Sequence, residues 1–195
     1  MTIAKVWLRV RALARALSAD SSGIAATEFA VIVPIMLVMF FGVVEFSNGV
    51  AVDRKVTLMA RTLSDLTSQS ISVTSTDLTN FFAASAGIMT PYSTTPVNST
   101  ITELYVNPVT LAARAQWSVG AAPHAVGSTV TIPVELAIGG TYVIWSEISY
   151  TYVPVIGYVM APTGVTMHDV SYTRPRQSQC VLYNPPSSPP PCPTS

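Results

Sequence analysis

Charged residues are scarce in this chain of 195 residues. Only 10% of the residues are Asp, Glu, Lys or Arg, against roughly 25% in an average soluble domain, and the mean hydropathy is +0.45. Between Thr62 and His168 the only cation is Arg114, so the sequence has no basic surface that could neutralise phosphates. The composition therefore excludes nucleic acid as a partner and indicates a long apolar segment.

Cysteine and histidine are also rare, with two of each. Cys180 and Cys192 lack the C-x-x-C spacing of zinc and redox sites, and we expect them to pair in an oxidising compartment; two free thiols are the alternative. His124 and His168 have no nucleophile motif such as G-x-S-x-G, and no phosphate loop or H-E-x-x-H occurs. We therefore expect no catalytic residue, no cofactor and no metal site.

The longest apolar run lies near the N-terminus. No residue from Phe29 to Val44 is charged or strongly polar, and a helix over residues 24–52 is long enough to cross about 30 Å of hydrocarbon. A core helix of a soluble protein is the alternative, but such a helix rarely runs this far without a polar face. The segment ahead of the run carries four cations and one acid, namely Lys5, Arg9, Arg11, Arg15 and Asp20. By the positive-inside bias, this excess keeps the N-terminus in the cytoplasm and exports the remainder.

A cleaved secretory signal competes with a membrane anchor. Gly49-Val50-Ala51 has the small-x-small pattern of a signal peptidase site, and cleavage there would release a soluble product that begins at Val52. The apolar run is longer than the usual signal core of about 7 to 15 residues, and an acid lies at each of its ends. The pattern therefore favours an anchor.

The two acids at the ends of the run differ in what they imply. Glu28 lies within the apolar segment, where a lone carboxylate costs at least about 2.5 kcal/mol, so a partner is expected for it. Glu45 follows about 25 Å further along the helix, near the opposite interface, where it can reach water.

The residues around Glu28 read Gly-Ile-Ala-Ala-Thr-Glu-Phe from Gly23 to Phe29 and resemble the processing site of prepilins of the type IVb, tight-adherence class. In that family a membrane-embedded prepilin peptidase cleaves after the glycine on the cytoplasmic side, and the glutamate becomes the fifth residue of the mature chain. The resemblance implies Gly23, Ile24, Glu28 and Phe29 as the processing site. Phe29 stands where many members have tyrosine.

Cleavage after Gly23 would also supply the missing partner of Glu28. It exposes an α-amine on Ile24, which is mostly protonated near neutral pH. Ile24 and Glu28 are four residues apart and share a helical face, so the amine can pair with the carboxylate of its own or a neighbouring subunit. The alternative is a glutamate that simply reaches the lipid headgroups from the helix end.

Further phrases extend the resemblance along the chain. Ala26 to Ala30, Val33-Pro34 and Gly42 to Phe46 are similar to the TadE signature. Three later phrases look like recurring ones of the same family: Ala115 to Ser118, Glu147 to Pro154 and Tyr172 to Arg176. TadG-type relatives usually have a much longer ectodomain, so the length favours a TadE-like or TadF-like member.

Two helical segments are expected beyond the membrane. Apolar residues alternate at spacings of four and three: Val52, Val56, Met59, Leu63 and Leu66. This stripe predicts that the helix continues outside and docks on its own domain, with docking on other subunits as the alternative. A Ser- and Thr-rich loop over residues 68–76 should cap a shorter helix, in which Leu78, Phe81, Phe82 and Ser85 share a face.

Strand patterns follow. From Leu111 to Val119 the odd positions are predicted to lie on one face, and from Tyr142 to Tyr152 the even positions, with a turn at Gly139-Gly140 between them. Shorter candidates are residues 101–107 and 165–172. The prolines of the last stretch cannot donate to a sheet ladder and indicate an extended or disordered tail.

The predicted fold class is α+β, with a long N-terminal transmembrane helix that continues into a periplasmic helix and a pilin-like antiparallel sheet. Its expected parts are a basic leader (1–23), a transmembrane helix (24–52), a periplasmic helical segment (53–90), a β-rich ectodomain (91–178) and a Pro-rich tail (179–195).

The resemblance implies a minor pilin or pseudopilin, processed after Gly23, that serves biogenesis of a tight-adherence, Flp-type pilus. Its expected partners are the inner membrane, prepilin peptidase, the major pilin, sibling minor pilins and the pilus assembly platform. Its expected location is the bacterial inner membrane as a single-pass protein with a periplasmic C-terminal domain, with the extracellular pilus as the second location. An uncleaved, membrane-anchored adhesin or receptor domain is the alternative function.

Overall fold

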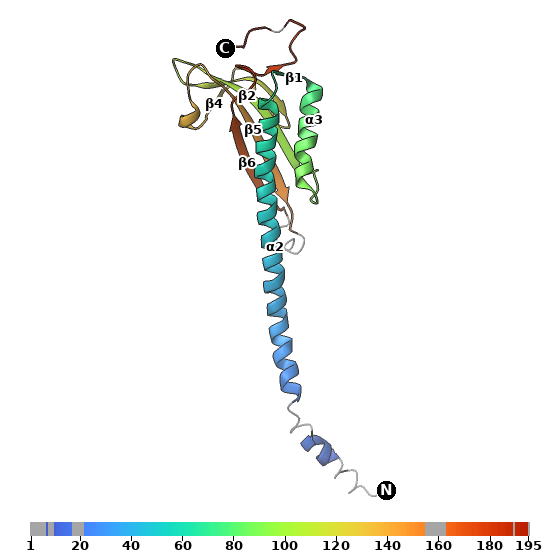
Figure 1. Cartoon of the computed structure of the whole chain (residues 1–195). Helices are drawn as coiled ribbons and strands as arrows, with labels where there is room; N and C mark the ends of the chain where they lie inside the picture. The colour runs from blue at the N-terminus through green and yellow to red at the C-terminus, as the bar shows by residue number, and fades with distance from the viewer. Residues whose placement is uncertain (1–6, 8–9, 17–21, 155–162, 189, 195) are drawn as a thin grey trace. The chain divides into compact units, whose positions relative to one another are not determined.

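The computed structural model describes residues 7, 10–16, 22–154, 163–188 and 190–194 (Figure 1). The chain divides into two compact units, Met1–Phe46 and Ser47–Ser195. In the leader, Lys5, Arg9 and Asp20 lie outside the described residues, whereas Arg11 places its guanidinium 4.5 Å from the centroid of the Trp7 ring.

Helix α2 (Ser22–Ser68) has 47 residues and passes through Pro34 without interruption. Its first part exposes large apolar side chains on all sides, including Ile35, Val38 and Phe46. Over Gly23–Ser68 it contains an 18-residue window with a mean hydropathy of 2.5, so by length and composition it can cross a membrane. The expected long apolar helix is confirmed.

The last five turns of α2 pack against the sheet of the second unit. One stripe of side chains is no more than 1% exposed: Val52, Val56, Met59, Ala60 and Leu63. Burial of each large apolar side chain contributes roughly 1.5 to 3 kcal/mol. The Ser146 hydroxyl also donates to the Ala60 carbonyl at 2.6 Å and thereby joins the sheet to α2. The prediction that the stripe docks on its own domain is confirmed for Val52, Val56, Met59 and Leu63, whereas Leu66 is half-buried and lines a hollow instead.

Helix α3 (Ser75–Ala86) follows the short strand β1 (Ser72–Val73). Thr74 and Asp77 form a capping box, which satisfies free N–H groups at the helix start. Leu78 is fully buried, and the half-buried Phe81 and Phe82 pack on the same core, as the sequence predicts. After α3 comes a single 3-10 turn, η1 (Gly87–Met89).

The main sheet has five strands in the order β4-β3-β2-β5-β6. They are β2 (Val97–Val106), β3 (Ala113–Gly120), β4 (Thr129–Val130), β5 (Tyr142–Tyr152) and β6 (Val165–Thr173). Every neighbouring pair is antiparallel, which confirms the expected sheet. The predicted turn before β5 is present: Gly140 adopts a φ of 79° and its N–H donates to the Val106 carbonyl at 2.8 Å.

Both faces of the sheet are buried over its centre. The face toward α2 and α3 carries Ile101, Ile144 and Ile148, while the opposite face carries a second cluster with Leu104 and Trp145. Residues after β3 pack against the second cluster, namely Val130, Ile132 and Ala137, the last of which follows the 3-10 turn η2 (Val134–Leu136).

The predicted alternation from Leu111 to Val119 is wrong in its second half. The β2–β3 register passes from Glu103 opposite Trp117 to Leu104 opposite Ala115, so Gln116 is an extra residue in a β-bulge. A bulge shifts the side-chain period by one residue. Ala115 therefore joins the cluster opposite the helices, and Trp117 joins the cluster beneath them.

The C-terminal stretch begins with a strand that the sequence does not indicate. Strand β7 (Leu182–Tyr183) pairs in parallel with β1, and the preceding Val181 is fully buried. Both residues of β7 precede Pro185, so the proline-rich part stays outside the ladder.

Candidate functional site

The predicted processing site lies in the first two turns of α2. The side chains of Ile24 and Phe29 are 60% and 68% exposed, and Glu28 is exposed as well. The Thr27 hydroxyl donates to the Ile24 carbonyl at 2.8 Å, and this bond holds the Thr27 side chain against the helix backbone. Ile24, Thr27, Glu28 and Val31 follow the helical spacing of a single face.

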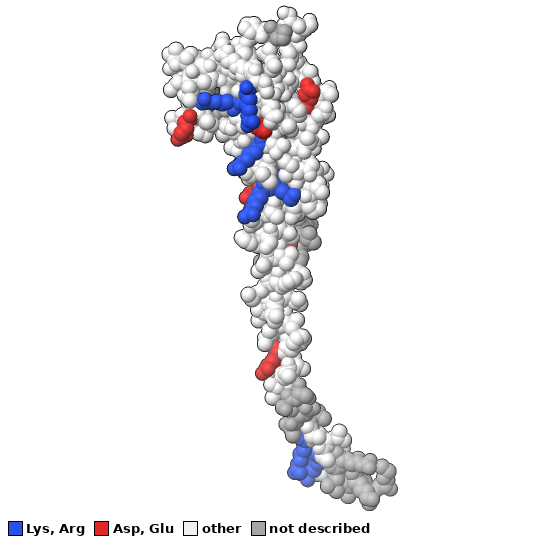
Figure 2. Space-filling view, viewed as in Figure 1, with Lys and Arg blue, Asp and Glu red and all other residues white. Residues whose placement is uncertain are grey.

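Glu28 is chemically isolated in this segment. It borders an apolar hollow with Thr27, Val31 and Ile32, and within the described part of the chain no cation pairs with it. No Lys or Arg occurs between Arg15 and Arg54. Figure 2 accordingly shows a long surface without blue side chains along the apolar part of α2. A carboxylate in such surroundings needs a cation from elsewhere if it enters hydrocarbon.

A buried carboxyl group, Glu103, is a feature that the sequence reasoning missed. The side chain is fully buried, and its Oε1 accepts a hydrogen bond from the Val181 N–H at 2.5 Å. Trp117 Nε1 donates to the Val181 carbonyl at 2.7 Å, so two side chains of the sheet hold one residue of the C-terminal segment. Burial raises the pKa of Glu103 to about 8. The alternation of residues in this strand does place Glu103 on the same face as the apolar Ile101 and Tyr105, and this pattern predicts a buried carboxyl group.

The two cysteines meet at the end of the same segment. Cys180 and Cys192 form a disulfide with their Cα atoms 5.8 Å apart, and Cys180 is 2% exposed. The bond closes a short loop over the proline-rich residues. Nearby, the Tyr142 hydroxyl donates to the Pro193 carbonyl at 2.6 Å. The chain end is therefore tied to Cys180 by the disulfide and to strand β5 by the hydrogen bond from Tyr142.

Breaking this link should lower the stability of the second unit. Cys192→Ser removes the disulfide without altering the buried Cys180, and we expect the free energy of unfolding to fall by about 3 kcal/mol, as for loops of this size. Urea unfolding of the purified full chain measures the change. Reduction of the wild-type protein should give the same loss, and an unchanged unfolding midpoint in both cases would contradict the expectation.

Both histidines, His124 and His168, line one small hollow of the second unit. The structure brings Glu147 to His124, with Oε2 and Nε2 2.6 Å apart, and the His124 ring stacks on Trp145 at 4.7 Å. The His124 N–H donates to the Ser118 hydroxyl, so the pair anchors the loop after β3. His168 lines the same small hollow of about 150 Å³, but among the described residues no hydrogen bond links it to a nucleophile. No group of three or more His, Cys, Asp or Glu in the described part of the chain could hold a metal ion.

The comparison with protein families matches one segment of the chain. Residues 23–63 match the model of the family described as TadE-like protein, a structural family. The match begins at the predicted cleavage glycine and ends within the docked part of α2. The three ectodomain phrases lie beyond it and stay predictions. The comparisons with curated proteins and with solved structures give no match.

The family match and the long apolar helix both support association with a membrane and with pilus-related partners. Over residues 23–63 this chain is therefore similar to TadE-like proteins, the family that its sequence motifs predict, and the match supports a role associated with the tight-adherence pilus.

Proposed function

We propose that this protein is a minor pilin or pseudopilin that is inserted in the bacterial inner membrane and is cleaved after Gly23 by prepilin peptidase. The cleaved chain then joins or primes assembly of the tight-adherence pilus with the major pilin, sibling minor pilins and the assembly platform. The observation that carries this proposal is the TadE-like match that begins at Gly23, together with an isolated Glu28 five residues later.

The orientation follows from charge. Arg11 and Arg15 stand on the N-terminal side of the apolar helix, and the positive-inside bias keeps them in the cytoplasm. A periplasmic second unit suits the disulfide between Cys180 and Cys192, because disulfides persist in oxidising compartments. This topology also places Gly23 on the cytoplasmic side, where the peptidase cuts in the family.

The N-terminus of the protein extracted from membranes tests the proposal. We expect sequencing to begin at Ile24. A chain that begins at Met1 or Thr2 would support the uncleaved adhesin or receptor, and one that begins at Val52 would support a secretory signal.

Two glycine variants provide a matched pair for this test. A Cβ atom added at Gly23 or at Gly49 meets no atom within 4 Å beyond the adjacent helix backbone, so both positions leave space for a larger residue. Gly23→Leu should abolish processing and leave the precursor in the membrane, whereas Gly49→Leu should be processed like the wild type. Normal processing of Gly23→Leu would contradict cleavage at this site.

A further inference from the structure

We propose that the outer edge of strand β6 is a docking site for an extended segment of another protein, which adds to the sheet as a sixth strand. The incoming segment carries an acidic side chain that binds beside Arg61. This inference concerns the second unit alone and does not depend on cleavage after Gly23.

Strand β6 ends the sheet and is paired on one side only. Its nine residues pair with β5 from Val165 opposite Tyr152 to Thr173 opposite Ile144, and no described strand lies on its other side. At the opposite end of the sheet β4 has only two residues. A long edge strand with free backbone groups is a template for pairing with another chain.

The orientation of the backbone shows which groups are available. The Val170 N–H donates to Oδ1 of the preceding Asp169 at 2.7 Å and so faces the edge rather than β5. Backbone groups alternate in direction along a strand, so those of Thr166, His168 and Tyr172 face the same way. Outside the ladder, no backbone hydrogen bond between described residues uses these groups.

Most of the usual protection of an edge strand is missing from β6. Proteins block exposed edges with proline, lysine or a bulge. The sequence of β6 has no proline, lysine or arginine, and its register with β5 shows no shift. The Asp169 carboxylate accepts a hydrogen bond from only one outward backbone donor, the Val170 N–H. The edge is thus open over the remainder of its length in the described structure.

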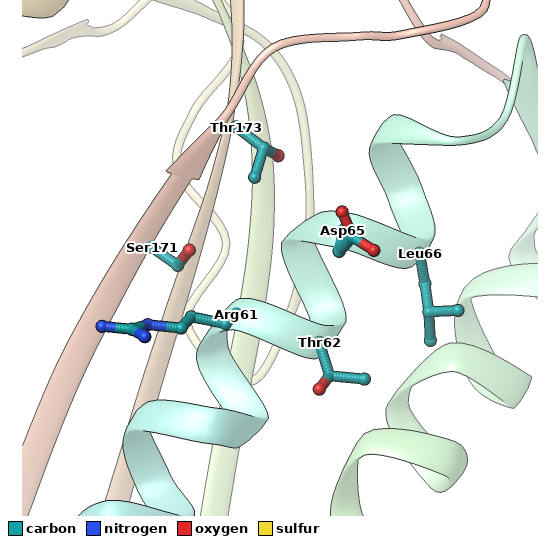
Figure 3. A pocket seen from close by; sticks show the side chains of 6 residues that line it. All are labelled: Arg61, Thr62, Asp65, Leu66, Ser171 and Thr173. Atoms are coloured by element: carbon teal, nitrogen blue, oxygen red, sulfur yellow. The ribbon is translucent and has the colours of Figure 1, made fainter.

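A hollow of about 330 Å³ lies between this strand and α2, and can take side chains of the added strand. It is lined by Arg61, Thr62, Asp65, Leu66, Ser171 and Thr173. Figure 3 shows the Arg61 side chain extending from α2 toward Ser171 on β6. Alternate side chains of an added strand would lie on the same face of the sheet as Ser171 and Thr173, which places them in the hollow.

The charges around the hollow select an acidic side chain. Asp65 is paired with Arg176, while Arg61 is exposed and has no acidic partner among the described residues. Figure 2 shows Lys and Arg side chains gathered over this part of the molecule. A guanidinium binds a carboxylate through two parallel hydrogen bonds, so an Asp or Glu of the partner complements Arg61.

A second copy of β6 does not supply this acid. The only acidic residue in β6 is Asp169, and its carboxylate already accepts hydrogen bonds from the Thr57 hydroxyl and the Val170 N–H. The occupant is therefore a different acidic segment, and self-pairing through β6 is an outcome that the test must separate.

A synthetic peptide can test the site on the full-length protein purified in detergent. The probe is a fluorescently labelled nine-residue peptide of alternating Thr and Val with Asp at its centre, and its binding is followed by fluorescence anisotropy. We expect at least tenfold tighter binding than for the same peptide with Lys in place of Asp. Arg61→Gln should remove this preference, while Arg54→Gln, an exposed arginine two turns earlier on α2, should retain it.

The strand-pairing step has its own controls. His168→Pro removes one outward N–H and places a ring in the path of the added strand, and we expect it to weaken binding at least tenfold without lowering the unfolding temperature appreciably. A peptide that is N-methylated on the residues facing β6 should bind to the wild-type protein as weakly as the unmethylated peptide binds to His168→Pro. This control tests strand pairing even if His168→Pro does not fold.

Three results would overturn the proposal. They are no binding of the acidic peptide to the wild type, equal binding of the N-methylated peptide, and concentration-dependent self-association that His168→Pro abolishes. Because Gly23→Leu leaves β6 unchanged, peptide binding by that uncleaved variant separates a failure here from a failure of the proposed pilin role.

Discussion

Raising the pH from about 5 to about 8 is expected to destabilise the second unit, and Glu103→Gln is expected to remove most of this loss. Burial raises the pKa of Glu103 from 4.5 to about 8, against the smaller opposing effect of the hydrogen bond from the Val181 N–H. Above pH 4.5 the unfolded chain carries this carboxylate ionised, whereas the folded chain keeps it neutral until about pH 8. Unfolding therefore releases a proton throughout this window.

The sign and the size of the effect follow from this proton. The folded state binds one more proton than the unfolded state, so the free energy of unfolding falls by up to about 1.4 kcal/mol per pH unit. The full contribution is present below the unfolded pKa and is lost as the pH rises through the folded pKa. Across the window the loss reaches on the order of 5 kcal/mol.

Urea unfolding of the full chain at pH 5, 6, 7 and 8, followed by tryptophan fluorescence, measures the slope. Glu103→Gln stays neutral at every pH, and its amide oxygen can still accept the hydrogen bond from the Val181 N–H. Glu135→Gln is the matched control, because Glu135 is exposed in η2 and should leave the slope unchanged. A slope that is equal in wild type and Glu103→Gln would refute the assignment.

The second large effect is expected at Glu28. Glu28→Ala should leave membrane insertion intact and reduce incorporation into pili at least tenfold. Insertion does not need the carboxylate, which costs at least about 2.5 kcal/mol in hydrocarbon. Assembly needs it, because under the proposed function the carboxylate pairs with the α-amine of Ile24 of the same or a neighbouring subunit in a medium of low dielectric constant.

Immunoblots of sheared pili and of membranes measure incorporation and insertion separately. Glu45→Ala is the control, since it removes an acid from the same helix near the opposite interface, and it should assemble normally. Glu28→Gln should behave like Glu28→Ala if charge is what matters. Equal amounts of Glu28→Ala and wild type in pili would exclude the pairing.

Local patterns in the sequence predict most of the elements of this fold. The apolar run from Phe29 to Val44, the stripe from Val52 to Leu66 and the even positions from Tyr142 to Tyr152 each specify an element and the face that it buries. These predictions succeed because hydrophobic periodicity depends only on residues close together in the chain. The capping box of Thr74 and Asp77 likewise involves residues only three positions apart in the chain.

Other features were decided only when distant segments met. The bulge at Gln116 depends on the register between β2 and β3, and a single extra residue moves Trp117 to the face beneath α2. Strand β7 exists because β1 offers it a partner more than a hundred residues earlier in the chain. A two-residue strand has no periodicity of its own to reveal it.

The sequence alone determined a long apolar helix that can cross a membrane, its continuation docked on the domain and an antiparallel sheet, because each of these follows from the local spacing of apolar residues. Only the tertiary structure decided that Glu103 is buried against Val181 and that the edge of β6 stays open beside Arg61. Burial, pKa and exposed edges depend on which segments cover one another, and that is settled by the packing of the whole unit rather than by any one stretch of residues.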